Sequence, residues 1–255
     1  MATGLLVLLV GRATRLTPYV PGDPKVYTAS VLLGRETDTF DLQGNVLSEN
    51  GYGGGVEEVE KAMEGLIGEW EQVPPAFSAV QKDGVRAYTL ARRGVTVERT
   101  PRAIEIFALT VRAIALPDVE FDAHCSKGTY IRSLAHDLGE RLGCGACLTA
   151  LTRLASGSFT LDDALTLDQL RDAFAQNSVE HFLYPLDEAL LQFQAVTVNA
   201  ENAQRIQRGN SVFCERADTT PLLRAYAPNG ECIALLERGR QAGEWKPHKV
   251  FLSDL

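Results

Sequence analysis

The stretch from residue 102 to residue 143 constrains the fold most, because the spacing of its apolar residues changes part way along. RAIEIFALTVRAIAL (102–116) and VEFDAHCS (119–126) carry the β-branched and aromatic residues that are typical of strands. YIRSLAHDLGERL (130–142) instead repeats apolar residues every three or four positions, and Gly143 follows it as a stop signal. Those apolar positions are Ile131, Leu134, Ala135, Leu138 and Leu142. Strands that lead into an amphipathic helix predict an α+β fold.

Shorter patterns predict elements before this stretch. Residues 5–10 and 25–34 are apolar runs with the composition of strands. TDTFDLQGN (37–45) predicts a turn in which Asp and Asn side chains cap the backbone. From Val56 to Trp70 apolar residues recur every three to four positions, which predicts a helix with a glutamate-rich outer face.

Two further helices and a loop are expected. Residues 73–81 contain adjacent prolines, so we expect a loop or an edge segment there. Residues 85–94 predict a short basic helix that ends at Gly94. Another helix is expected to start at Thr166, because Gln169 stands at capping-box spacing from it.

The pattern changes near Leu183–Pro185, which predicts a boundary between two domains. We assign residues 1–184 to the main α+β domain. Residues 185–255 predict a small β-rich module with one short helix. A chain of 255 residues is long enough to bury a substantial core.

Composition and motifs exclude several classes of protein. The longest apolar run, LLVLLV after Gly4, is too short to span a bilayer and lacks signal-peptide flanks, so we expect a cytoplasmic protein. The chain has five cysteines at irregular spacing, which argues against a disulfide framework. Cys144 and Cys147 have metal-site spacing but form a single pair, so we interpret them as buried apolar residues and predict no metal. Nucleotide-binding glycine motifs are missing.

The net charge of −8 does not exclude a nucleic-acid partner, because the basic residues are clustered. Residues 82–102 contain six basic and two acidic residues. Phosphates respond to charge within roughly a Debye length, about 10 Å at 0.1 M salt. SAVQKDGVRAYTLARRG (78–94) also mixes basic residues with Tyr88, which suits contact with phosphates and unstacked bases. A solvated basic face is an equally good interpretation of this stretch on sequence alone.

The segment KGTYIRSL (127–134) suggests a site. Gly128 permits an unusual turn between a strand and a helix, so Lys127, a threonine hydroxyl and the first helical N–H groups favour a nearby anion. Arg132 lies off the apolar face, where an inward-pointing guanidinium would hold a carboxylate. Spacing alone favours the alternative, a solvent-facing charge.

Four long segments resemble the TruB family of tRNA pseudouridine synthases. They are ATGLL followed by GRATRLTPY, then KVYTASVLLGRETDTFDLQG, VPPAFSAVQKDGVRAYTLARRG, and HCSKGTYIRSLAHDLGERLGCGACLTALTRLASGSF. They occur in family order and cover about residues 2–170. The last seventy or so residues resemble the family's small PUA-like RNA-binding domain more weakly. The resemblance implies a mixed or antiparallel catalytic sheet with flanking helices, followed by that β-rich domain.

The resemblance also implies a reaction and a set of residues. Family members convert uridine 55 in the T-loop of tRNA to pseudouridine, after flipping it into a pocket, without metal or cofactor. Tyr27 matches the tyrosine that packs against the base, Tyr130 and Arg132 match pocket residues, and Leu151 matches an apolar wall. Arg132 would pair with the catalytic carboxylate and keep it ionised. The expected RNA-contacting residues are Lys82, Arg86, Tyr88, Arg92, Arg93 and Lys127.

The chain departs from the family at the catalytic aspartate. In the family, ATGLL follows a loop that ends in Leu-Asp-Pro, whereas here Met1 stands just after that position. Asp23, Asp38, Asp41 and Asp137 match no catalytic position. We therefore expect a member truncated at its N-terminus whose 255-residue form is inactive.

Two alternatives stay open. The first is a non-catalytic RNA-binding or RNA-folding protein that acts on T-arm hairpins, since the basic stretch and Arg132 would serve it equally. The second is a non-functional remnant, in which lost strands leave an exposed sheet edge. In each case we expect a monomer.

Overall fold

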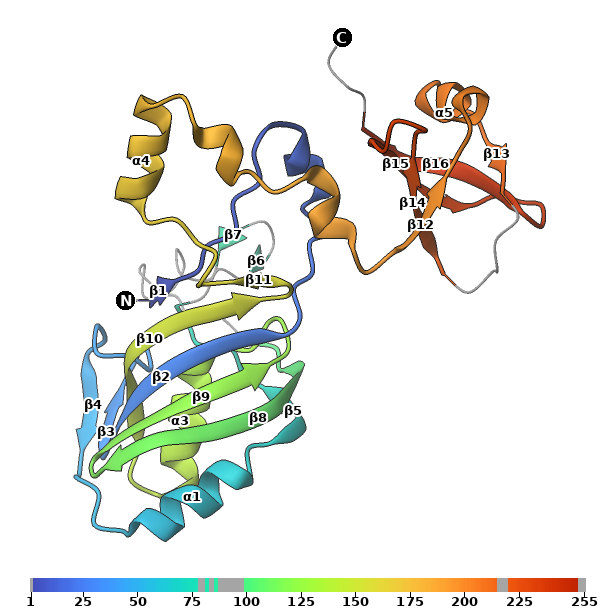
Figure 1. Ribbon diagram of the computed structural model, residues 1–255. Helices are drawn as coiled ribbons and strands as arrows, with labels where there is room; N and C mark the ends of the chain where they lie inside the picture. Colours follow the sequence, from blue (N-terminus) through green and yellow to red (C-terminus); the bar gives the residue numbers. More distant parts are fainter. Residues whose placement is uncertain (1, 78–80, 83–84, 87–98, 215–219, 252–255) are drawn as a thin grey trace. The chain divides into compact units, whose positions relative to one another are not determined.

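The computed structural model describes residues 2–77, 81–82, 85–86, 99–214 and 220–251 (Figure 1). The chain divides into two compact units. The first consists of Met1–Val7 and Gly22–Ala164, and the second of Leu8–Pro21 and Leu165–Leu255. Contacts therefore divide the chain between Ala164 and Leu165, and the boundary at residues 184 and 185 stays a prediction.

The first unit is built on one mixed sheet. Its strand order is β1 (Ala2–Gly4), β10 (Ala146–Ser156), β2 (Lys25–Leu33), β9 (Asp118–Cys125), β8 (Arg102–Ala115) and β5 (Gly68–Gln72), with β11 (Phe159–Thr160) paired to β10. Strand β1 runs parallel to β10, and the other neighbours are antiparallel. The α+β prediction is confirmed, and so are the predicted strands at 25–34, 102–116 and 119–126.

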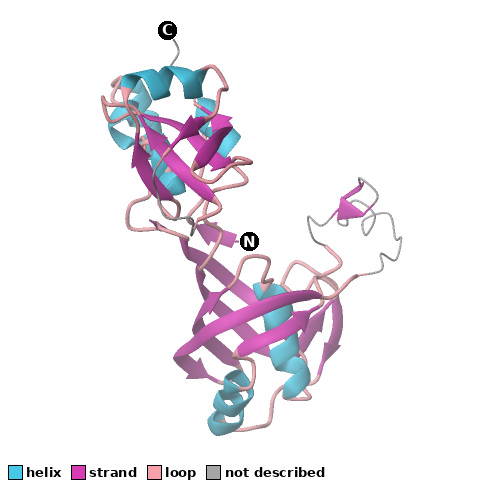
Figure 2. Ribbon diagram, turned by 90° about the vertical axis from the view of Figure 1, so that its right-hand side faces the viewer, coloured by secondary structure: helices cyan, strands magenta, loops and turns pink. Residues whose placement is uncertain are grey.

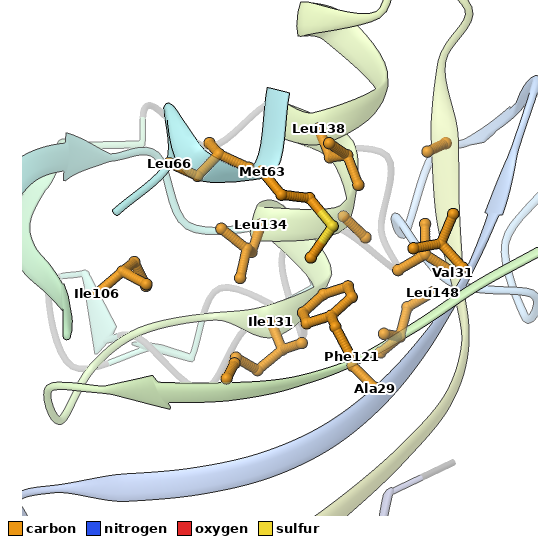
Figure 3. Close-up of a cluster of buried hydrophobic side chains, with 14 of the residues drawn as sticks. Ala29, Val31, Met63, Leu66, Ile106, Phe121, Ile131, Leu134, Leu138 and Leu148 are labelled. Carbon is orange, nitrogen blue, oxygen red and sulfur yellow. The ribbon is translucent and has the colours of Figure 1, made fainter. Parts of the chain in front are cut away.

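Two helices, α1 (Val56–Glu64) and α3 (Ile131–Arg141), cover one face of this sheet (Figures 1 and 2). Figure 3 shows the contact: Met63 and Leu66 from the α1 segment and Ile131, Leu134 and Leu138 from α3 surround Phe121 of β9. All six side chains are at most 3% exposed. The predicted helix over 130–142 is thus confirmed, and its apolar face holds the helix on the sheet.

The far end of α3 packs closely against β10. Gly139 accepts backbone hydrogen bonds from Cys144 and Gly145, at 3.1 and 3.2 Å. A Cβ on Gly139 would overlap the backbone of Gly145 and Ala146, so the helix approaches the strand closely only because this residue has no side chain. Cys144 and Cys147 are buried at this junction, as predicted.

Three predicted elements are wrong at least in part. Residues 5–10 form no strand. Gly4 has φ +93°, and among residues 5–10 only Leu5 forms a backbone hydrogen bond to β10. Leu6 and Leu8 are 69% and 66% exposed. The helix from Val56 ends at Glu64, and Trp70 lies in β5 instead. The Trp70 ring packs on the same core as the helix does. Its spacing in the sequence therefore matched a helical pattern although the residue lies in a strand.

The third is the basic helix predicted at 85–94, which the structure contradicts only at its first two residues. Val85 and Arg86 form β7, which pairs with β6 (Gln81–Lys82) in a small hairpin. Residues 87–94 lie outside the described residues. The predicted turn at 37–45 is confirmed and follows β3 (Arg35–Thr37), which pairs with β4 (Val46–Glu49).

The second unit contains a five-stranded sheet. Its order is β12 (Gln194–Thr197), β14 (Leu222–Tyr226), β15 (Cys232–Arg238), β16 (Glu244–Val250) and β13 (Val212–Phe213). Helix α5 (Ala200–Gln207) packs on it through Ala203 and Ile206 around the buried Trp245. The predicted β-rich module with one short helix is confirmed.

The rest of this unit is helical. Helix α4 (Leu167–Ala175) begins with the predicted capping box of Thr166 and Gln169. Short 3-10 helices occupy Gly11–Leu16, Val179–Phe182 and Leu186–Leu190. Among the described residues, every helix falls short of the length and apolar character needed to cross a membrane.

We predict that Gly139→Ala destabilises the protein, although alanine is the better helix former by roughly 1 kcal/mol. The added Cβ forces α3 away from β10, and such overpacking costs about 1–3 kcal/mol of unfolding free energy. Urea denaturation checks this. Glu140→Ala is the control, because Glu140 is the exposed neighbour on the same helix and should change stability by less than about 0.5 kcal/mol. A Gly139→Ala variant more stable than the unmodified protein would contradict the close packing.

Asp137 on α3 gives the protein a pH-dependent stability. One of its carboxylate oxygens, Oδ2, is buried and has no hydrogen-bond partner among the described residues. Burial raises the pKa of this carboxyl from 3.8 to about 6. Between those values the folded protein holds a proton that the unfolded chain has released, so the free energy of unfolding falls as the pH rises through this window.

We predict that Asp137→Asn removes this component. The variant should be more stable than the unmodified protein at about pH 7, and the difference should shrink toward zero by about pH 4. Urea denaturation of both proteins across this range measures the difference, in which the titration of other carboxyls cancels. Equal stability at all pH values would show that the Asp137 carboxylate is not destabilised by burial.

Candidate functional site

The guanidinium of Arg132 lies in the first turn of α3 and is held on three sides. Its Nη1 donates to Asp41 Oδ2 and to the carbonyl of Thr39, both at 3.2 Å, and its Nη2 donates to the carbonyl of Phe77 at 2.8 Å. The side chain is 23% exposed. Arg132 therefore points inward and does pair with a carboxylate, so the solvent-facing alternative is wrong. The pair uses one guanidinium nitrogen and is not bidentate.

Asp41 is the carboxylate in this pair. Its Oδ1 accepts hydrogen bonds from Thr39 Oγ1 at 2.7 Å and from the backbone N–H of Gln43 at 3.0 Å. Both carboxylate oxygens are thus occupied, and the residue is 9% exposed. The sequence predicted the capping role but missed the contact with Arg132. No local signal in the sequence separates Asp41 from Asp38, which also caps this turn by accepting from the backbone N–H of Asn45.

Tyr130 precedes α3 and occupies its N-cap position without a side-chain cap. Its backbone is held instead by the side chain of Gln72, at the end of β5. Gly128, two residues earlier, has φ +87°, which agrees with the predicted unusual turn. Sequence reasoning missed Gln72, a polar residue in a strand that its pattern did not reveal.

Tyr27 and Leu151 lie on the sheet face that α3 covers. In the pairing of β2 with β10, Leu151 stands opposite Ala29 and Tyr27 stands opposite Arg153. Opposed residues and those two positions away share a face, and Ala29 is part of the core beneath α3. Tyr27 and Leu151 both pack against that core. Burial raises the pKa of the Tyr27 hydroxyl, so this ring stays neutral near pH 7.

The predicted RNA-contacting residues are described only in part. Lys82 and Arg86 lie in the β6–β7 hairpin. Tyr88, Arg92 and Arg93 lie outside the described residues. The Lys127 side chain is 74% exposed, with Nζ 4.0 Å from Asp23 Oδ2. Its backbone N–H donates to the same carboxylate. Lys127 therefore presents its charge to solvent just before Tyr130.

One group of side chains in the described residues has metal-ligand geometry. The ligand atoms of Glu36, His136 and Glu140 lie within 4.8 Å of one another, and His136 Nδ1 is 3.6 Å from Glu36 Oε1. The His136 ring stacks on Phe40, with centroids 4.1 Å apart. Glu140 is exposed and lies eight residues after Arg132 on α3, about 12 Å along the helix. His136 lies only one helical turn after Arg132, and Phe40 stands between Thr39 and Asp41, which bond to Arg132, so the group adjoins the Arg132 site at one end.

Comparison with protein families matches all of the first unit and part of the second. Residues 1–131 match the TruB family pseudouridylate synthase (N terminal domain), and residues 132–191 match the tRNA pseudouridylate synthase B C-terminal domain. The tRNA pseudouridine synthase B of Geobacter sulfurreducens is 44% identical over 209 residues, which is 82% of this chain and 69% of that protein. The same enzyme from Clostridium perfringens is 35% identical over 260 residues, 99% of this chain and 86% of that protein.

Solved structures share the fold at low sequence identity. An H/ACA RNP bound to a substrate RNA containing 2′-deoxyuridine has a chain with TM-score 0.66 and 20% identity, covering 96% of this chain and 71% of that one. A Cbf5-Nop10-Gar1 complex has one with TM-score 0.65 and 22% identity, covering 96% and 70%. Family matches over both halves of the sequence, close relatives along almost its full length and a shared fold lead to one conclusion: the chain belongs to the TruB family of pseudouridine synthases.

Proposed function

We propose that the site around Arg132 is built to isomerise uridine 55 in the T-loop of tRNA to pseudouridine. The observation that carries this proposal is the inward-facing guanidinium of Arg132, half-buried at the start of α3 in the segment that matches the family's motif. Relatives of this chain are tRNA pseudouridine synthases, which supports tRNA as the substrate. A tRNA substrate also favours a cytoplasmic location, and we expect a monomer.

The reaction is an isomerisation and needs no redox partner. The bond between N1 of uracil and C1′ of ribose breaks, and a bond between C5 and C1′ forms. The hydrogen on C5 leaves as a proton, and N1 gains one. A carboxylate nucleophile would assist this step, and a neighbouring arginine would keep that carboxylate ionised by lowering its pKa.

We propose that Tyr27, Tyr130 and Leu151 form the pocket for the flipped base. Flipping a base costs a few kcal/mol of stacking, and stacking on an aromatic ring returns about 1–3 kcal/mol. Tyr27 and Leu151 share the sheet face beneath α3, and Tyr130 stands at the start of that helix. This shared location supports one pocket that is walled by a strand pair and a helix N-terminus.

The RNA hairpin would be gripped by Lys127 and by the basic residues of the 82–102 stretch. Lys127 offers an exposed charge three residues before Tyr130. Lys82, Arg86, Arg92 and Arg93, with the ring of Tyr88, would contact phosphates and bases further along the hairpin.

We further propose that this 255-residue polypeptide binds the T-arm without isomerising it. Among the described residues, Asp41 is the carboxylate paired with Arg132, and it already accepts three side-chain and backbone hydrogen bonds at its two oxygens. A carboxylate so fully engaged is a poor nucleophile. With Asp41 engaged in this way, the second candidate function is a module that binds the T-arm hairpin without chemistry.

The absence of turnover is tested with a T-arm hairpin that carries tritium on C5 of its target uridine. We predict no release of tritium above background, because isomerisation is the step that frees this hydrogen. The hairpin must be shown to bind under the same conditions. Sustained release by this polypeptide would refute the proposed inactivity and leave the family reaction standing.

Binding is tested with Lys127→Ala. We predict weaker binding of the T-arm hairpin and a salt dependence whose slope in log Kd against log salt falls by about one. Arg112→Ala is the matched control, because Arg112 is half exposed on β8 and ion-paired with Asp122. Equal losses from both variants would point to non-specific attraction rather than to a grip beside Tyr130.

A further inference from the structure

The side chain of Gln72 forms a two-point clamp on the backbone of Tyr130. Gln72 Oε1 accepts a hydrogen bond from the Tyr130 N–H at 2.8 Å, and Gln72 Nε2 donates to the Tyr130 carbonyl at 3.1 Å. We propose that Gln72 is a positioning residue, which fixes the Tyr130 ring and the first turn of α3 for the bound nucleotide. This inference rests on the proposed function of the site.

The clamp has a local physical reason. An α-helix leaves its first N–H groups without helical partners, and the N-cap side chain usually satisfies one of them. Tyr130 has no side chain that can do so, and no side-chain cap bond is present here. Gln72, at the end of β5, instead accepts from a different unpaired donor, the N–H of the N-cap residue Tyr130 itself. It is 1% exposed, so water cannot replace it when it is removed.

The segment that follows Gln72 holds the same turn of the helix. Ser133 Oγ donates to the carbonyl of Val73 at 2.9 Å, and Arg132 Nη2 donates to the carbonyl of Phe77 at 2.8 Å. Gln72, Val73 and Phe77 therefore bond to Tyr130, Ser133 and Arg132, respectively. Gln72 begins this series and is the member that acts through its side chain.

The clamp continues a set of hydrogen bonds that holds the turn before Tyr130. Gly128 has φ +87°, and nothing lies within 4 Å of the place where its Cβ would be. On either side of this open turn, the N–H of Ser126 donates to the Glu105 carbonyl and that of Tyr130 to Gln72. Gln72 holds both the N–H and the carbonyl of Tyr130. The direction of the Tyr130 Cα–Cβ bond, and thus of its ring, is therefore set by the edge of the sheet.

A matched pair of RNA ligands separates positioning from general structural support. One T-arm hairpin carries the target uridine, and the other is abasic at that nucleotide but otherwise identical. Gln72→Met keeps the volume and removes both hydrogen bonds. We expect it to weaken binding of the uridine hairpin about fivefold or more, the lower end of what base stacking contributes, and of the abasic hairpin less than about twofold. Thr110→Met, a change at an exposed residue of β8 in the same unit, should leave both unchanged.

A second variant restores the clamp chemically. In Gln72→Glu an ionised carboxylate repels the Tyr130 carbonyl, whereas a protonated carboxyl can donate to it and still accept from the N–H. Burial raises the pKa of such a carboxyl. At each pH we divide the affinity of this variant for the uridine hairpin by that of the unmodified protein. This ratio should rise toward one as the pH is lowered from about 8 to about 5.5. Asp137 on α3 interacts directly with Gln72 and has its pKa raised to about 6 by burial. The ratio is therefore measured with both proteins carrying Asp137→Asn.

The outcomes are distinct. Selective loss for the uridine hairpin in Gln72→Met, with recovery of Gln72→Glu at low pH, supports the positioning role. Unchanged affinity in both variants, or an equal loss for both hairpins without recovery, overturns it. If the unmodified protein binds neither hairpin, the proposed function itself fails, and the role of Gln72 in it fails with it.

Discussion

The seating of α3 on the sheet is the constraint on which the rest of the first unit depends. Its apolar face buries Ile131, Leu134 and Leu138 against the strands, and Gly139 allows the close approach to β10. Because a helix is stiff, fixing these side chains also fixes its first turn. The polar groups of that turn then sit at the edge of the core, where they can be reached from solvent and yet are held by protein.

The polar contacts at the start of α3 come from segments that are distant in sequence. Arg132 meets Asp41 from a turn 91 residues earlier, and Tyr130 meets Gln72 from 58 residues earlier. Breaking one partner of such a half-buried set leaves the other without compensation, which is costly even where the intact pair contributes little net stability. The arrangement therefore specifies geometry more than it adds stability. That is the property a site for a flipped base requires.

Local periodicity accounts for what could be predicted from the sequence. The strands at 102–116 and 119–126 and the helix at 130–142 each contain a complete apolar pattern, and the capping box at Thr166 is a local signal. The inward orientation of Arg132 could not be derived from spacing, and only the resemblance to a family favoured it. Asp41 and Gln72 escaped prediction because their roles arise from tertiary contacts that no local pattern records. The helix from Val56 was predicted to extend to Trp70 because a strand residue can reach the same core as a helix residue.

The central claim is that Tyr27, Tyr130, Leu151 and Arg132 surround one nucleotide. The most direct measurement is a crystal structure of this protein bound to a T-arm hairpin with 5-fluorouridine at the target position. We predict that this base is flipped out of the loop, stacked on the ring of Tyr27 and bounded by Tyr130, with the Arg132 guanidinium beside the ribose. A hairpin bound elsewhere, or a target base still stacked in its loop while these four side chains face different surfaces, would contradict it.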